Sequence, residues 1–280
     1  MTRRPMVQIH PSLPFYIHRG SYLSLSVFTL MRGKFIAILM ACSFLFSGCL
    51  GADQESSLIQ ISVNMEGASG TVHFVKDANN GTSIEGMQVS FDFTGTESSG
   101  GALTEFWLEP GDGTQRMSTN AAESKILSRD YASYGIFQSR AGANDSGGNS
   151  ASDELTISFN GAFHLNQTSP TGVDEPADLH IDSMNINSIQ SPVKLEISST
   201  ITNVENALAI PPPDDVEITW QLFDPSGELI ATHTQVIGEG QSYTWTHNEE
   251  IPMIGGWELI IGDAVDNENV NQETTALVLF

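Results

Sequence analysis

Short stretches of alternating apolar and polar residues, separated by clusters of glycine, asparagine, aspartate and serine, recur along most of this chain. Leu58–Met65, Met87–Phe93 and Val216–Phe223 are examples of the stretches, and Asp77–Gly81 and Asn144–Asn149 are examples of the clusters. A period of two places one face of a strand in a core and the other in solvent. Because helical patterns are scarce, we expect an all-β protein of antiparallel sheets.

The stretch Phe106–Thr114 combines the end of a strand with a tight turn. Gly111 and Gly113 supply the positive φ angles that such turns need, and Asp112 can hydrogen-bond the backbone around it. Some fifteen residues later, the pattern Tyr-x-x-Tyr-Gly-x-Phe at 131–137 predicts a second turn that enters a second strand.

These two motifs, together with Val89–Asp92 and the closing Asp153–Ile157, resemble the polycystin-type repeat, the PKD domain. That family is a small immunoglobulin-like β-sandwich, and the resemblance covers residues 58–160. It implies that Tyr131 has a buried ring and a hydroxyl bonded to the backbone.

Trp107 departs from the family pattern, which places Trp-Asp-Phe directly before Gly-Asp-Gly. Here Leu108 takes the tryptophan place and Pro110 the phenylalanine place, so Trp107 falls on the opposite face. Two readings follow: an exposed aromatic platform for sugar, or a one-residue bulge that returns the ring to the core. Because large aromatic side chains are mostly buried, we favour the core.

Residues 161–176 are mostly polar and are predicted to be a linker, and residues 177–280 then carry a second set of strand patterns. Asp224–Gly227 is a strong hairpin turn between two of them. Seven strands in about a hundred residues is the number found in an immunoglobulin-like or fibronectin-like sandwich. We therefore expect two such sandwiches in tandem, with Trp220 and Trp257 in the core of the second. The seven predicted strands are Asp178–Ile186, Val193–Thr202, Val216–Phe223, Glu228–Val236, Ser242–His247, Trp257–Gly262 and Thr274–Phe280.

The first 48 residues have the pattern of an export signal. Arg32 and Lys34 precede the apolar run Phe35–Phe46, which is too short to span a bilayer and fits a signal-peptide core. The stretch that ends at Cys49 resembles a lipobox, with Phe46 where Leu, Val or Ile is usual. We expect Cys49 to carry a lipid, residues 49–57 to form a tether, and Met31 to be the true start.

Charge and cysteine content restrict the function further. Of 11 basic residues, five precede Asp53, the first acid, so six remain against 34 acids and the chain from Asp53 onward carries −28. This charge excludes nucleic acid and anionic lipid as partners. Cys42 leaves with the signal and Cys49 is lipidated, so no thiol remains for a disulfide or for catalysis. No nucleophile or zinc motif is present, and we expect no enzyme.

Calcium is the one cofactor with some basis in the sequence, because oxygen donors gather in one loop at Asp263, Asp266, Asn267 and Glu268. The alternative is an acidic, solvated turn, which we favour. Asp77, Asn79 and Glu85 form a weaker cluster. Possible glycosylation sequons begin at Asn80, Asn144 and Asn166, all in expected loops.

The sequence thus predicts an exported protein, anchored by lipid to the outer face of the cell membrane, with a structural or adhesive role. Its partners would be the membrane and an envelope protein or polysaccharide. One alternative is an accessory binding lipoprotein of an exported hydrolase or transporter. Another is a calcium-stiffened spacer with no ligand of its own.

Overall fold

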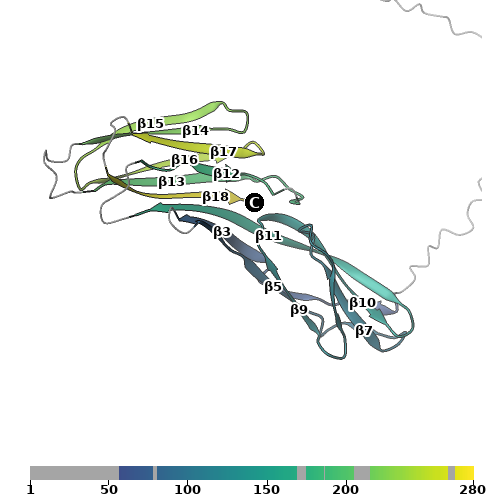
Figure 1. Ribbon diagram of the computed structural model, residues 1–280. Coiled ribbons are helices and arrows are strands. Elements are labelled where there is room, and N and C mark those ends of the chain that lie inside the picture. Colours follow the sequence, from purple (N-terminus) through teal and green to yellow (C-terminus); the bar gives the residue numbers. More distant parts are fainter. Residues whose placement is uncertain (1–56, 78–80, 169–174, 186, 205–214, 264–268) are drawn as a thin grey trace, which may run out of the picture. The chain divides into compact units, whose positions relative to one another are not determined.

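Strands are the only regular elements in the part of the chain that the computed structural model describes (Figure 1). Residues 57–280 group as one compact unit. No helix among the described residues is long and apolar enough to cross a membrane. The prediction of an all-β protein is therefore confirmed. The described residues are 57–77, 81–168, 175–185, 187–204, 215–263 and 269–280.

In the described ranges, eighteen strands follow one another along the chain with no other regular element between them. The first nine are β1 (Ile59–Gln60), β2 (Asn64–Glu66), β3 (Ser69–Asp77), β4 (Gly81–Glu85), β5 (Met87–Asp92), β6 (Glu97–Ser98), β7 (Leu103–Glu109), β8 (Met117–Asn120) and β9 (Ile126–Tyr131). The others are β10 (Gly135–Asp145), β11 (Ser150–Gln167), β12 (Leu179–Asp182), β13 (Lys194–Asn203), β14 (Val216–Phe223), β15 (Leu229–Ile237), β16 (Ser242–Glu250), β17 (Gly256–Asp263) and β18 (Val270–Leu279).

Four sheets contain these strands. The largest has nine strands in the order β16-β13-β18-β11-β10-β7-β8, with β3 also paired to β11 and β4 paired to β3. A four-stranded sheet has the order β12-β17-β14-β15, and a three-stranded sheet has the order β2-β5-β9. Strands β1 and β6 form a separate pair.

The three-stranded sheet packs on the part of the large sheet that holds β7, β10 and β11. Tyr131 on β9 joins these layers, because its ring centroid lies 6.0 Å from that of Phe137 on β10 and 5.5 Å from that of Phe159 on β11. All three side chains are fully buried. Buried and more exposed residues alternate on β5, so Val89 and Phe91 face the core between the two layers.

The four-stranded sheet packs on the other part of the large sheet, which holds β13, β16 and β18. Trp220 on β14 joins them: its indole N–H donates to the hydroxyl of Ser199 on β13 at 3.0 Å, and its ring lies 6.5 Å from that of Trp245 on β16. Trp220 is fully buried and Trp257 on β17 is 2% exposed, so both lie in this core. The pattern of Val216–Phe223 predicts β14 with its bounds.

Strand β11 belongs to both parts of the large sheet (Figure 1). Its first part, Ser150–Phe159, pairs antiparallel with β10. Its second part, Gly161–Gln167, pairs antiparallel with β18, while Ser158–Asn166 pairs parallel with β3. One continuous strand thus connects the two packed regions through backbone hydrogen bonds.

The prediction of a linker over 161–176 is therefore wrong for residues 161–167. Polar residues hid the strand pattern there: His164 and Asn166 alternate with Phe163 and the buried Leu165. The expected strand Leu58–Met65 also differs, because it is divided into β1, which pairs with β6, and β2, which pairs with β5.

Candidate functional site

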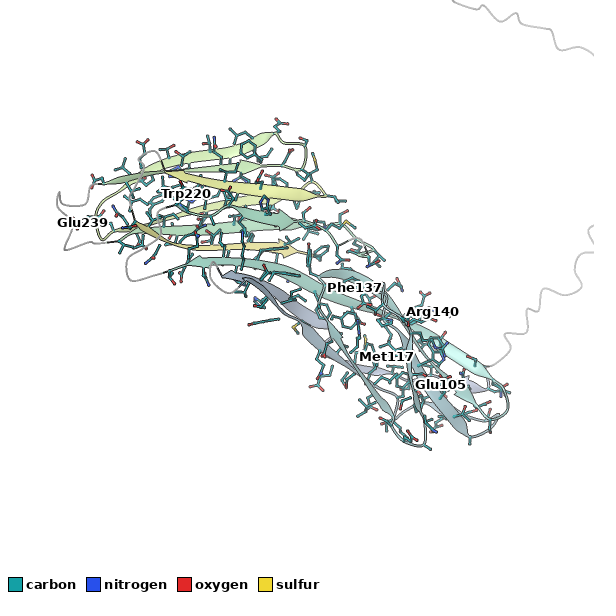
Figure 2. All side chains as sticks on the ribbon, viewed as in Figure 1. Glu105, Met117, Phe137, Arg140, Trp220 and Glu239 are labelled. Carbon is teal, nitrogen blue, oxygen red and sulfur yellow. The ribbon has the colours of Figure 1, made fainter. Side chains whose placement is uncertain are left out.

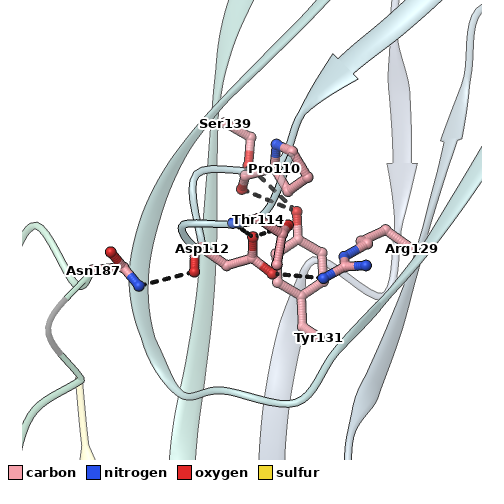
Figure 3. A network of polar contacts seen from close by, with 7 residues as sticks. All are labelled: Pro110, Asp112, Thr114, Arg129, Tyr131, Ser139 and Asn187. Atoms are coloured by element: carbon pink, nitrogen blue, oxygen red, sulfur yellow. Dashed lines mark hydrogen bonds and ion pairs between the residues drawn. The ribbon is translucent and has the colours of Figure 1, made fainter. Parts of the chain in front are cut away.

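The turn after β7 is held by a network of polar contacts (Figure 3). Gly111 and Gly113 have φ angles of 81° and 84°, as the turn requires. The side chain of Asp112 accepts hydrogen bonds from the backbone N–H and the hydroxyl of Thr114. Its other oxygen pairs with Arg129 at 3.2 Å. The Asp112 side chain thus has its partners within the protein and serves the fold.

Tyr131 and Ser139 attach the same turn to the core. Both hydroxyls donate to the carbonyl oxygen of Pro110, at 3.2 Å and 2.5 Å. Burial raises the pKa of Tyr131 to about 12. Asn187, on the loop before β13, donates to the carbonyl oxygen of Asp112 at 2.9 Å. The turn therefore also connects the two packed regions, outside β11.

Trp107 lies on the outer face of the large sheet. Phe106 and Leu108 face the core, and Trp107 alternates with them in unbroken register with β10, where it is opposite Gly142. Trp107 is buried, as we favoured, but the one-residue bulge that we expected to bury it is wrong. The platform reading also needs correction, because Trp107 is only 5% exposed.

Two neighbours explain how a tryptophan on an outer face is buried. The ring lies in the space above Gly142, where a β-carbon would come within 2.4 Å of Cζ2. From the other side, the guanidinium carbon of Arg116 stands 4.1 Å from the ring centroid. The indole Nε1 is buried and has no hydrogen-bond partner among the described residues. A covered aromatic ring with an unused donor is the unusual feature of this face.

Polar side chains surround the covered ring, and Figure 2 shows Glu105 and Arg140 on this part of the chain. Glu105 pairs with Arg116 at 3.6 Å and accepts from the amide of Asn144 at 2.5 Å. Arg140 pairs with Glu109 at 3.8 Å. We call Trp107 with Glu105, Glu109, Arg116, Arg140 and Asn144 the Trp107 face.

The sequence analysis identified only Trp107 and Asn144 of these six residues. The signal for the others was weak: Glu105, Glu109 and Arg140 alternate along β7 and β10 with core residues, as any solvent-facing residue of a strand does, and Arg116 lies in the turn before β8. Arg116 and Arg140 had one further signal, because only six bases follow Asp53.

The possible glycosylation sites are not in loops where the structure describes them. Asn144 lies on β10, half-buried, and its amide is bonded to Glu105. Asn166 lies on β11, and its side chain is exposed. The expectation of loops is wrong for both, because each lies one residue before the end of its strand. Asn80 and the lipidation residue Cys49 lie outside the described residues.

The expected calcium loop begins at the end of β17 with Asp263, and Asp266, Asn267 and Glu268 lie outside the described residues. Of the weaker cluster, Asp77 ends β3 and Glu85 ends β4, whereas Asn79 lies outside. Within the described part of the chain, no three His, Cys, Asp or Glu side chains are grouped as a metal site.

Comparison with known proteins finds no matching family model and no matching curated protein. Among solved structures, a carbohydrate-binding module of the β-sandwich superfamily aligns over 79% of this chain and 97% of its own, at 9% identity and a TM-score of 0.30. The xylan-binding domain CBM22-1 of Paenibacillus barcinonensis Xyn10C covers 52% of this chain and 81% of its own, at 11% identity and a TM-score of 0.24. The fibronectin(III)-like modules of Clostridium thermocellum CbhA cover 76% and 91%, at 13% identity and a TM-score of 0.24. Because these identities and TM-scores are low, we infer the sandwich architecture from the strand pairing and packing described above.

Proposed function

We propose that this chain is a non-catalytic binding protein, exported and lipid-anchored at Cys49, that holds a carbohydrate on the Trp107 face. The observation that carries the proposal is the Nε1 atom of Trp107, which is buried on the outside of a sheet and has no hydrogen-bond partner in the part of the chain that the structure describes. A buried donor without a partner costs about 1–3 kcal/mol. A ligand oxygen that reaches this nitrogen recovers that energy.

The cover over the ring is easy to displace. The Arg116 side chain is 42% exposed. A cation–π contact at such a site contributes about 0.5–1 kcal/mol, and an exposed ion pair such as Arg116–Glu105 about 0–1 kcal/mol. Both are small against the gain from stacking a sugar ring on indole and hydrogen-bonding its hydroxyls. Arg116 would then turn from the ring to the ligand.

The surrounding groups suit a neutral, hydroxyl-rich ligand. Carboxylates of Glu105 and Glu109 accept hydrogen bonds, and Arg116, Arg140 and Asn144 donate them. The acidic chain repels polyanions, which disfavours a nucleic acid or a highly sulfated glycan. The proposal therefore names a neutral polysaccharide of the cell surface or its surroundings.

The test is binding of purified protein to an array of neutral glycans, followed by titration of the best one. We expect Trp107→Ala to weaken binding at least tenfold and Arg116→Ala to preserve or improve it, with melting temperatures recorded for both. Lys125→Ala, which changes an exposed base that is not part of the Trp107 face, is the control. No bound glycan, or equal binding by Trp107→Ala and the parent protein, would refute the proposal. Retention of Cys49→Ser in the membrane fraction would separately refute the anchor.

A second candidate is the accessory binding protein of an exported hydrolase or transporter. A hollow of about 630 Å³ lies where β11 passes β12 and β17, within the range of small-molecule sites. Two of its lining residues are aromatic. It is lined by Phe163, His180, Ile181, Asp182, Gly255, Gly256, Trp257 and Glu258. Loss of glycan binding in Phe163→Ala but not in Trp107→Ala would favour this candidate.

A further inference from the structure

Two histidines that are far apart in the sequence meet on one side of the large sheet, and neither belongs to the Trp107 face. The Nδ1 atom of His73 on β3 lies 2.9 Å from the Nε2 atom of His164 on β11. The parallel pairing of these strands produces the contact, because it places Ala162 beside His73 and therefore His164 two residues further along the same face.

The other nitrogen of His164 is also engaged. Its Nδ1 lies 3.1 Å from the hydroxyl oxygen of Thr275, the residue opposite it on β18. When this nitrogen carries the proton and donates to Thr275, the Nε2 lone pair of His164 is directed at His73. A second partner of this kind fixes the ring and tautomer of histidines that bind metals. In that tautomer, His164 accepts and the Nδ1 atom of His73 donates the one proton between the two rings.

A carboxylate stands on the same face. Glu85 on β4 is the direct cross-strand partner of His73, so their side chains leave the sheet side by side. Glu85 is exposed, and its charge acts on His164. In the described structure it is not yet grouped with the two rings as a third ligand. Its exposed side chain must therefore turn toward the two rings before it can act as a ligand.

We propose that His73, His164 and Glu85 bind one divalent transition-metal ion, Zn²⁺ or Cu²⁺, which replaces the proton shared by the imidazoles. Two imidazoles with one carboxylate suit these ions, whereas Ca²⁺ and Mg²⁺ take oxygen ligands. Metal–nitrogen bonds of about 2.0–2.1 Å at angles of about 90–110° separate two nitrogens by roughly 2.9–3.4 Å. The observed separation of 2.9 Å lies at the lower end of that range.

Small movements complete the site. The two rings are nearly parallel, at 18°, so each must turn for both lone pairs to converge on one ion. Burial and the neighbouring His73 lower the pKa of His164, and the Glu85 charge opposes that shift. The bound ion would join β4, β3, β11 and, through Thr275, β18.

The chain contains a matched control. His180 on β12 and Glu258 on β17 are also a cross-strand pair, 3.6 Å apart, but no other histidine among the described residues is paired with them. Purified protein is titrated with ZnCl₂ and CuCl₂ at pH 7.5, with calorimetry, melting temperature and the Cu²⁺ electron spin resonance spectrum as readouts. The same measurements are made on His73→Ala, His164→Ala, Glu85→Gln and His180→Ala.

We expect one ion per chain, a rise in melting temperature of about 5–10 °C at a free metal concentration about 100 times Kd, and a spectrum with two nitrogen ligands. His73→Ala and His164→Ala should each weaken binding at least tenfold and leave at most one nitrogen, whereas His180→Ala should match the parent protein. Glu85→Gln should weaken binding less. The proposal is overturned if the parent protein binds no stoichiometric ion, or if His180→Ala loses as much affinity as His164→Ala. Neither result bears on glycan binding at Trp107.

Discussion

The indole ring of Trp107 occupies the space that any side chain at Gly142 would need. A β-carbon at position 142 would come within 2.4 Å of the ring and 2.5 Å of the carbonyl oxygen of Ala151. One of these neighbours is backbone and cannot swing aside. Glycine at position 142 is therefore what allows a tryptophan to be buried on the outer face of β7.

This relationship predicts that Gly142→Ala destabilises the protein. Overpacking of this kind costs about 1–3 kcal/mol, measured as the free energy of unfolding in urea. Gly256→Ala is the control, because a β-carbon there meets nothing within 4 Å. Equal stability of the two variants would show that Trp107 does not lie over Gly142.

We expect the hydrogen bonds of the Asp145 carboxylate to make the protein less stable in acid. It lies at the end of β10 and is nearly buried, and its side chain accepts hydrogen bonds from the hydroxyl of Ser98, from the Asn149 amide and from two backbone N–H groups. The Ser98 hydrogen bond, followed by those from Asn149 and Gly147, lowers the pKa of Asp145 to about 2.

The direction of the pH dependence follows from the linkage between protonation and folding. The folded-state pKa lies below the unfolded value of about 3.9, so the stabilisation is fully present above that pH and is lost as the pH falls toward 2. Asp145→Asn should therefore flatten the decrease of melting temperature between pH 4 and pH 2, whereas the exposed control Asp153→Asn should not. A parallel decrease in both variants would contradict this role.

The effects of substituting Tyr131 and Ser139 on the free energy of unfolding should be coupled. Each donates to the carbonyl oxygen of Pro110, so Tyr131→Phe or Ser139→Ala leaves that oxygen with one donor. Each single change should cost about 0.5–1.5 kcal/mol. The double variant also leaves a buried acceptor unpaired, which adds a penalty of about 1–3 kcal/mol. In a double-mutant cycle measured in urea, the loss of unfolding free energy in the double variant should therefore exceed the sum of the two single losses. Strict additivity would argue against a shared acceptor.

Strands with regular alternation were predictable from the sequence. Val216–Phe223 has its predicted bounds because one face is consistently apolar and the turn residues around it are distinct. The turn at Gly111 and Gly113 was predictable for the same reason, since its geometry is local. Strand β4 was not predicted, because all of its residues are exposed and no buried face marks it.

The candidate sites were less predictable, because they depend on contacts between distant strands. His73 and His164 are 91 residues apart, and only the register of β3 against β11 brings them together. The position of Trp107 was predictable from alternation, but its cover by Arg116 on the far side of a turn was not. The full length of β11 was not predicted, because the solvent-facing residues of its second part, Gly161–Gln167, are polar and make this segment look like a loop.

Differential scanning calorimetry tests most directly whether β11 makes both packed regions one cooperative unit. We predict a single transition in which the calorimetric and van't Hoff enthalpies agree. Trp220→Ala, which removes a fully buried ring from the region around β14 at a cost of about 3–5 kcal/mol, should move that whole transition down by about 10 °C. Two resolved transitions, only one of which moves in Trp220→Ala, would contradict the account.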